Sequence, residues 1–181
     1  MLLDKVITNL KEKYKKVKFN NIRFNSKDCK LNDIFFAING NYTKGNSYIN
    51  NAIKNGAKII ISNLKFEGFS KNKILFLNSK NPRKLLSEVS NRYYKLKPKN
   101  IIAVTGTNGK TSVANFYNQI LSLNKINVAS IGTLGVISKK FSLKTNNTTL
   151  DPVRMHKILY KLKQFKVENV ILEASSHGLK Q

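Results

Sequence analysis

A strand–loop–helix segment in the second half of the chain constrains the fold more than any other feature. The apolar run 101–105 is followed by the loop Gly106-Thr107-Asn108-Gly109-Lys110-Thr111, and the stretch 110–123 is amphipathic. Glycines in such a loop let the backbone approach phosphate oxygens and turn its N–H groups inward. The following helix N-terminus adds positive potential. The segment therefore predicts a phosphate-binding loop between a buried strand and a helix.

Two side chains of this loop have expected chemical roles. Lys110 can reach the outer phosphates of a nucleotide, and the Thr111 hydroxyl is a candidate ligand for Mg²⁺. Val104 stands where the longer form of the motif has a further glycine, so this is the shortened pattern G-x-x-G-K-T. The alternative is a glycine turn that merely joins a strand to a helix.

A second polar segment, Glu173-Ala174-Ser175-Ser176-His177-Gly178-Leu179, follows the apolar strand 170–172. Ligand groups gather beyond the carboxyl ends of strands in open parallel sheets, so Glu173 is expected near the phosphate loop. A carboxylate in that place can bind Mg²⁺. Alternatively, Glu173 balances a lysine at a strand end. His177 could touch a substrate or only fix its loop by hydrogen bonds.

A third polar segment, Asn146-Asn147-Thr148-Thr149, precedes the helix cap Asp151. Its hydroxyls and amides can bind a polar ligand. The alternative is that Thr148 and Thr149 only extend a capping turn.

The apolar pattern predicts an α/β fold with two domains, 1–97 and 98–181, separated by the polar, proline-containing stretch 95–100. In the second domain, strands and helices alternate, which predicts a parallel sheet with crossover helices, a truncated P-loop-type ATPase domain. The strand 101–105 is expected to be buried. The helix residues expected to face the sheet are Val113, Phe116, Tyr117, Ile120 and Leu121.

In the first domain, the spacing of apolar residues predicts both helices and strands, as in a small α/β domain. Helical spacing covers 2–16, and further helices are expected at 48–53 and from Pro82 onward. Strands are expected at 22–24, 33–38, 58–62 and 74–77.

Charge is the outlier of the composition, with 33 Lys and Arg against nine Asp and Glu and a formal net charge of +24. Nearly all of the cations are lysine, whereas nucleic-acid readers favour arginine. Lys, Asn and Ile share A/T-rich codons, so a solvated surface of biased composition is favoured over polyanion binding.

The lack of an apolar run of about 18 residues argues against a membrane helix. The single cysteine, Cys29, and an N-terminus unlike a secretory signal predict a cytoplasmic protein.

Taken in order, the three polar segments resemble those of the Mur ligases. The G-T-N-G-K-T loop is shared across Mur and folylpolyglutamate-type ligases, and the S-S-H-G-L segment is similar to the branch that adds the third residue of the peptidoglycan stem peptide. Residues 25–27, 32–37 and 39–40 resemble that family's uridine-nucleotide-binding domain.

The resemblance implies an ATP-driven amide ligation through an acyl phosphate, with ATP and Mg²⁺ as cofactors. The substrates would be UDP-N-acetylmuramoyl-L-Ala-D-Glu and either diaminopimelate or lysine, acted on by a monomer. Lys110 and Glu173 would be catalytic, and Thr111 and Glu173 would bind the metal. The ATP-binding residues would be Gly106, Thr107, Asn108, Gly109, Lys110, Thr111 and Ser112. The substrate contacts would be Phe24, Ser26, Asn41, Tyr42, Thr43, Asn147, Thr148, Thr149, Ser175 and Gln181.

The sequence also departs from the family pattern. Asn32 replaces a usual glycine, Lys44 replaces a common acidic residue, and the chain is shorter than the family's enzymes, so we expect a fragment without ligation activity of its own. Three other interpretations remain: another P-loop enzyme such as a small nucleotide kinase, a basic nucleic-acid-binding module, and a non-catalytic remnant that still binds nucleotide.

Overall fold

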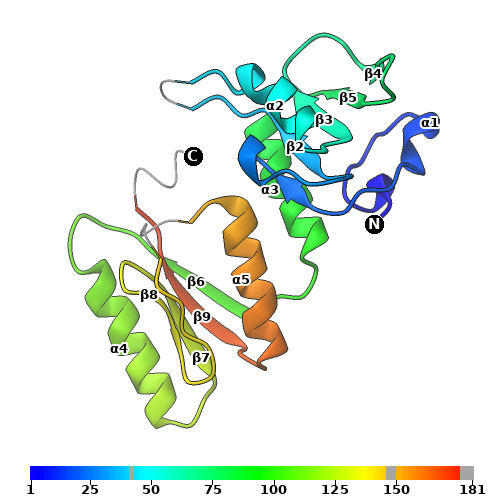
Figure 1. The fold of residues 1–181 in the computed structure, drawn as a ribbon. Coiled ribbons are helices and arrows are strands. Elements are labelled where there is room, and N and C mark those ends of the chain that lie inside the picture. The colour runs from blue at the N-terminus through cyan, green and yellow to red at the C-terminus, as the bar shows by residue number, and fades with distance from the viewer. Residues whose placement is uncertain (41–42, 146–149, 176–181) are drawn as a thin grey trace. The chain divides into compact units, whose positions relative to one another are not determined.

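An α/β architecture occurs twice along the chain (Figure 1). The computed structural model describes residues 1–40, 43–145 and 150–175. The chain divides into two units, Met1–Tyr93 and Tyr94–Gln181. The domain boundary expected between residues 97 and 98 stays a prediction.

The first unit contains a five-stranded sheet in the order β1-β2-β3-β5-β4. Its strands are β1 (Ile22–Arg23), β2 (Ile34–Phe36), β3 (Ile59–Ser62), β4 (Gly68–Phe69) and β5 (Leu75–Asn78). The first three and β5 run parallel, and β4 is antiparallel to β5. Both faces of β2 and β3 are buried, as expected for parallel strands that read as continuous apolar runs.

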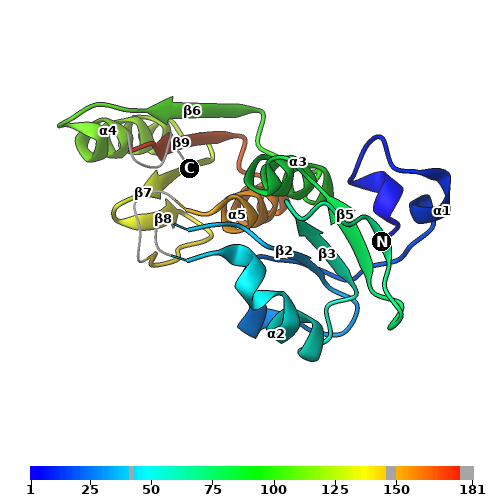
Figure 2. The same ribbon diagram turned by 90° about the horizontal axis from the view of Figure 1, so that it is seen from above.

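Helices cover both faces of this sheet, α2 (Ile49–Lys54) on one and α3 (Pro82–Tyr93) on the other (Figure 2). Ile49 and Ala52 of α2 pack with Phe35 and Ile60 of the sheet. The Asn81 side chain caps α3 by accepting a hydrogen bond from the Lys84 N–H at 2.9 Å, and Pro82 occupies the first helical position, as expected from the sequence. Short 3-10 turns occur at η1 (Leu3–Lys5), η2 (Ser26–Asp28) and η3 (Gly45–Tyr48).

The expected helix over residues 2–16 is wrong. Only η1 and the single turn α1 (Glu12–Lys15) form there. Asn9 between them has a left-handed φ of 57°, which ends a helix, and Leu2 bridges to Lys18 as extended chain. Leu3, Val6 and Tyr14 are nevertheless buried. The helical spacing therefore marked core residues correctly, while the backbone between them is irregular.

The second unit contains a four-stranded sheet in the order β6-β9-β7-β8. Its strands are β6 (Asn100–Val104), β7 (Val128–Gly132), β8 (Gly135–Ser138) and β9 (Asn169–Glu173). The strands β6, β9 and β7 are parallel, and β8 returns antiparallel along β7. Val136 of β8 also exchanges two backbone hydrogen bonds with Leu143, which forms a small hairpin around Lys139 and Lys140.

Two helices lie on opposite sides of this sheet, α4 (Lys110–Leu123) and α5 (Pro152–Gln164) (Figure 1). Asp151 caps α5 through a hydrogen bond from the Arg154 N–H at 2.9 Å, as its position before Pro152 predicted. Ile158, Leu159 and Leu162 of α5 pack against the sheet.

The expected burial of β6 and of one face of α4 is wrong in part. All five residues of β6 except Val104 are exposed, including Ile101 and Ile102. Val113, Phe116 and Ile120 of α4 are also exposed; the inner side of the helix carries buried Ala114 with half-buried Tyr117 and Leu121. One reason is that β6 is the outermost strand of this sheet, so no strand within 1–40, 43–145 and 150–175 pairs with its outer edge.

Candidate functional site

The carboxyl ends of the three parallel strands bring two of the three predicted polar segments, the phosphate-type loop and the segment that begins at Glu173, to one edge of the second unit. Val104 of β6 is level with Glu173 of β9, and Leu172 is level with Ile131 of β7. The loops that follow these strands therefore meet, as expected for a parallel sheet. They surround a hollow of about 350 Å³ lined by Thr107, Asn108, Gly109, Lys110, Thr111, Ser112, Thr133, Glu173 and Ser175.

The phosphate-type loop has the backbone that its glycines predicted. Gly106 has a φ of 147° and Gly109 has a φ of 79°, both in the region that side chains disfavour. Gly109 is the cap of α4, so the helix begins at Lys110. The Lys110 ammonium donates hydrogen bonds to the carbonyl oxygens of Gly106 at 2.5 Å and Thr107 at 3.2 Å. The lysine thus folds back over the loop at the positive end of a 14-residue helix.

Glu173 is a buried carboxylate that accepts hydrogen bonds from two threonines. The Thr111 hydroxyl donates to Oε2 at 2.8 Å, and Thr133 donates from its N–H to Oε1 and from its hydroxyl to Oε2, both at 3.1 Å. Glu173 is 4% exposed. None of the ion pairs found within 1–40, 43–145 and 150–175 includes Glu173. This observation argues against the alternative in which Glu173 balances a lysine.

Gly132, at the end of β7, provides the space for this carboxylate. A Cβ at residue 132 would lie 2.1 Å from Oε1 of Glu173, far inside van der Waals contact. Gly132 and Thr133 were not among the site residues predicted from the sequence. A signal was present, since a glycine followed by a hydroxyl residue directly after the apolar strand 128–131 stands at the carboxyl end of a parallel strand.

The oxygen atoms at this edge fit a divalent cation of the Mg²⁺ type. Mg²⁺ prefers oxygen ligands and commonly uses one or two carboxylates together with substrate phosphates. The Thr111 hydroxyl and the Glu173 carboxylate are 2.8 Å apart. No ion pair within 1–40, 43–145 and 150–175 includes this carboxylate, and a buried carboxylate without such a partner favours the binding of a cation. The described residues contain no cluster of three or more His, Cys, Asp or Glu side chains, so a phosphate ligand would have to complete the coordination.

The remaining predicted site residues do not all lie at this hollow. Ser175 lines the hollow beside Glu173. In the first unit Phe24 is 41% exposed, Thr43 is exposed, and Ser26 is buried, with its carbonyl accepting a hydrogen bond from Asn55 Nδ2 at 2.9 Å. Other predicted residues lie outside the described residues, namely Asn41, Tyr42, Asn147, Thr148, Thr149, His177 and Gln181.

The first unit has a polar hollow of about 290 Å³ at the carboxyl ends of its own parallel strands. Its polar lining residues are Asn39, Asn63, Lys80, Asn81 and Arg83. The hollow lies at the N-terminus of α3, and an Arg83 Nη2 donates to the Asn39 carbonyl at 2.9 Å. Two cations and a helix N-terminus make this place suited to an anion. This hollow was not predicted from the sequence.

Asn32 stands where the Mur ligase pattern usually has glycine, and it adopts a φ of 62°. Asparagine is among the few residues besides glycine that tolerate this conformation. The substitution therefore keeps the backbone turn that leads into Asp33.

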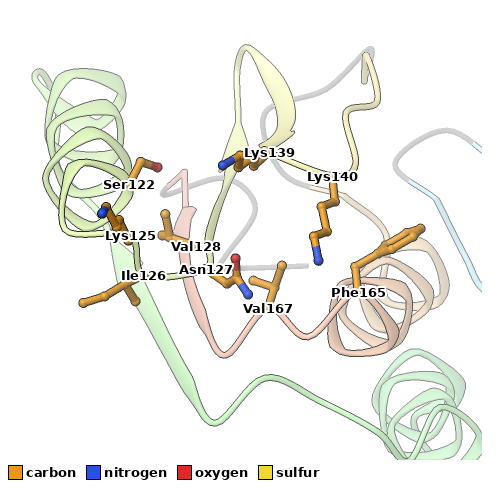
Figure 3. A pocket seen from close by; sticks show the side chains of 9 residues that line it. All are labelled: Ser122, Lys125, Ile126, Asn127, Val128, Lys139, Lys140, Phe165 and Val167. Atoms are coloured by element: carbon orange, nitrogen blue, oxygen red, sulfur yellow. The ribbon is translucent and has the colours of Figure 1, made fainter.

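A further hollow, of about 280 Å³, lies at the other end of the second sheet, where β7 and β9 begin (Figure 3). Lys125, Lys139 and Lys140 surround it together with Phe165 and Val167. It shares no residue with the phosphate-type loop.

Two family models match separate parts of the chain. The family "Mur ligase middle domain" matches residues 104–181, and "Mur ligase family, catalytic domain" matches residues 18–94. The chain belongs to the Mur ligase family. No helix in the described part of this Mur ligase chain is long and apolar enough to cross a membrane.

Two similar curated proteins carry the name UDP-N-acetylmuramoyl-L-alanyl-D-glutamate--2,6-diaminopimelate ligase. The protein of that name from Rickettsia montanensis is 40% identical over 177 residues, which are 96% of this chain and 36% of the relative. The Bradyrhizobium diazoefficiens protein is 37% identical over 160 residues, 88% of this chain and 32% of the relative. The chain thus spans about a third of the length of the curated relatives it matches.

Solved structures share the fold. A structure of a UDP-N-acetylmuramoyl-L-alanyl-D-glutamate--2,6-diaminopimelate ligase has a TM-score of 0.79 at 24% identity, covering 99% of this chain and 37% of that one. MurF ligase from Thermotoga maritima, solved in complex with ADP, has a TM-score of 0.56 at 22% identity, covering 86% of this chain and 32% of that one. These likenesses establish the mixed α/β fold with parallel sheets.

Proposed function

We propose that this chain forms the nucleotide- and sugar-substrate-binding part of an ATP-dependent ligase. This ligase extends UDP-N-acetylmuramoyl-L-Ala-D-Glu by one amino acid in peptidoglycan precursor synthesis. The observation that carries the proposal is the buried Glu173 carboxylate, 2.8 Å from Thr111 in the first turn of the helix that follows the phosphate-type loop. The names of the relatives favour diaminopimelate over lysine as the incoming amino acid. The proposed enzyme acts in the cytoplasm as a monomer.

The residues of the phosphate-type loop bind the triphosphate of ATP. The N–H groups around Gly106 and Gly109 and the N-terminus of α4 provide fixed positive potential for phosphate oxygens. Lys110, which hydrogen-bonds loop carbonyls at 2.5 and 3.2 Å, turns from these to the outer phosphates when a nucleotide binds. Its positive charge then stabilises the negative charge that develops as the γ-phosphoryl group moves to the substrate carboxylate.

Thr111 and Glu173 would hold Mg²⁺. The metal supplies charge neutralisation between the substrate anions when it is bound. Thr133 orients the Glu173 carboxylate through two hydrogen bonds of 3.1 Å, and Gly132 leaves the space that the carboxylate occupies.

The UDP end of the substrate is assigned to the first unit. The hollow beside α3 offers Lys80, Arg83 and several asparagines, which suit a diphosphate and a polar base. Thr43 and the exposed Phe24 ring are further candidate contacts.

Equilibrium binding of MgATP to residues 1–181 tests the nucleotide assignment. We expect Lys110→Ala and Glu173→Gln each to weaken MgATP binding at least tenfold, because each removes a charge that faces phosphate or metal. The matched control is Lys125→Ala, which removes a lysine next to the opposite end of α4 and leaves the affinity unchanged. Equal affinity in all four proteins would overturn the assignment of the loop.

A chimeric enzyme tests the reaction. Residues 1–181 replace the matched third of the Rickettsia montanensis ligase, and phosphate release is measured with UDP-N-acetylmuramoyl-L-Ala-D-Glu and MgATP. We expect release that depends on diaminopimelate and is abolished by Lys110→Ala. Phosphorylation of a nucleoside without an amino acid would instead support a nucleotide kinase.

A further inference from the structure

The hollow of about 280 Å³ where β7 and β9 begin combines apolar side chains with positive charge (Figure 3). Val128 and Val167, which start these two strand segments, are 4% and 3% exposed. A lysine cluster surrounds them: Lys125 extends from the end of α4, and Lys139 and Lys140 extend from the hairpin after β8. Sites for small molecules are typically concave and largely apolar, with a few polar groups that fix orientation. This hollow has that composition.

The lysine cluster has no acidic partner in the part of the chain that the structure describes. None of the ion pairs there includes any of its three members. From residue 94 onward the sequence has three acidic residues, and each already accepts hydrogen bonds within the second unit. These three are Asp151, Glu168 and Glu173. The second unit therefore has no spare carboxylate for the cluster, and an external anion can balance it.

The end of α4 does not require the Lys125 ammonium as a cap. The N–H groups of Lys125 and Ile126 donate to the carbonyl oxygens of Ser122 and Leu121 at 3.0 and 2.9 Å. This pattern satisfies helix carbonyls through the backbone alone, with Lys125 in the left-handed conformation at a φ of 60°. The ammonium group of Lys125 thus remains available to a ligand.

Phe165 gives the hollow an aromatic side. Its ring stacks on that of Phe141, with the ring centroids 5.8 Å apart and the planes at 20°. The Lys161 ammonium lies 5.7 Å from the Phe141 centroid. Phe165 is 40% exposed, and Ile126, also at the hollow, is 42% exposed. A ring held in place by stacking offers a flat apolar group a surface that needs little ordering on binding.

We propose that this hollow is a second anion-binding site, separate from the phosphate-type loop, for a small organic phosphate that carries a flat apolar group. A phosphate monoester has a charge of about −2 at neutral pH, which suits a cluster of three ammonium groups, and lysine binds phosphate as a point charge. The apolar group of the ligand lies against Ile126 and Phe165. Ser122 and Asn127 are the polar lining residues that orient it. The site does not depend on the proposed ligase function.

Titration of residues 1–181 with phenyl phosphate, followed by amide NMR shifts, tests the proposal. We expect saturable shifts at residues 122–128, 139–141 and 165–167. Inorganic phosphate lacks the ring and should bind at the same amides at least about tenfold more weakly, because it buries less apolar surface. Shifts confined to residues 106–112 would make the phosphate-type loop the place where this anion binds and would overturn the proposal.

Charge variants separate a built site from the general attraction of a basic protein. The double variant Lys139→Gln/Lys140→Gln should weaken phenyl phosphate binding at least about tenfold, since hydrogen bonds to charged groups are lost. The matched control Lys65→Gln/Lys71→Gln removes the same charge from exposed positions of the first unit and should change the affinity less than about twofold, because distant exposed charges are screened. Equal weakening in both would assign the binding to net charge and overturn the proposal, as would full affinity in the first variant. Lys110→Ala should retain phenyl phosphate binding at the hollow, so this result and that for the nucleotide site are distinguishable.

Discussion

The carboxylate of Glu173 occupies the place where any side chain at residue 132 would begin. A Cβ on Gly132 would lie 2.1 Å from Oε1 and 2.4 Å from Cδ of Glu173. The end of one strand thus accommodates the functional group of its neighbour, and the two residues are 41 positions apart in the sequence. The cradle is completed by Thr111 and Thr133, which hydrogen-bond the same carboxylate.

Replacing Gly132 by alanine should displace this carboxylate. We expect Gly132→Ala to weaken MgATP binding at least tenfold and to lower the free energy of unfolding by about 1–3 kcal/mol, the usual cost of overpacking a filled site. Isothermal titration and urea denaturation measure the two effects. In a Glu173→Ala background the same change should cost little stability, because the clashing atoms are gone. An equal loss in both backgrounds would show that Gly132 matters for another reason.

Thr133 should be a positioning residue for Glu173. We expect Thr133→Val to weaken MgATP binding about tenfold, since a hydrogen bond to a charged group contributes about 1.5–3 kcal/mol. Thr133→Ser keeps the hydroxyl and should bind MgATP like the natural sequence. If both variants bind equally well, the hydroxyl contact at 3.1 Å has no functional role.

Asp33 should be essential for the stability of the first unit. Its buried carboxylate accepts hydrogen bonds from Arg23 Nε at 3.0 Å, the Asn21 N–H at 3.0 Å and the Lys30 N–H at 3.1 Å. Asp33→Ala leaves these donors without their acceptor, and each unsatisfied buried donor costs about 1–3 kcal/mol, so the variant should unfold this unit at a much lower urea concentration. The comparison is Glu12→Ala, which removes an exposed ion pair with Lys15. We expect no measurable change in its urea midpoint.

His156 should make the second unit less stable in mild acid. Burial, aided by the nearby charge of Lys97, lowers the pKa of His156 from 6.5 to about 4, and its buried Nδ1 has no hydrogen-bond partner among the described residues. Between pH 6.5 and 4 the unfolded chain therefore takes up a proton that the folded chain does not. The free energy of unfolding should fall as the pH falls through this window and should be independent of His156 above it.

The variant His156→Gln isolates this contribution from that of the carboxylates. Urea denaturation of both proteins at pH 7.5, about 5.5 and about 4.5 should give a shallower decline for the variant. Parallel curves for the two proteins would mean that His156 is protonated equally in the folded and unfolded states.

Much of the fold could be predicted because its signals are local. The run 101–105, the loop with Gly106 and Gly109, and the caps Asn81 and Asp151 each specify backbone conformation within a few residues. The same local spacing predicted a helix over 2–16 that does not form, since it could not report the left-handed Asn9. Apolar patterning also predicted burial for Ile102 and Phe116, whereas exposure depends on what packs above them.

The amino-acid sequence by itself determined the phosphate-type loop, the parallel order of strands and helices, and the presence of a carboxylate at the end of β9. These follow from residue types at short, regular spacing. Only the tertiary structure decided that Glu173 would be held by Thr111 and Thr133 over Gly132, and that β6 would have an open edge. Both depend on which strands become neighbours, and strand order is set by packing between segments that lie tens of residues apart.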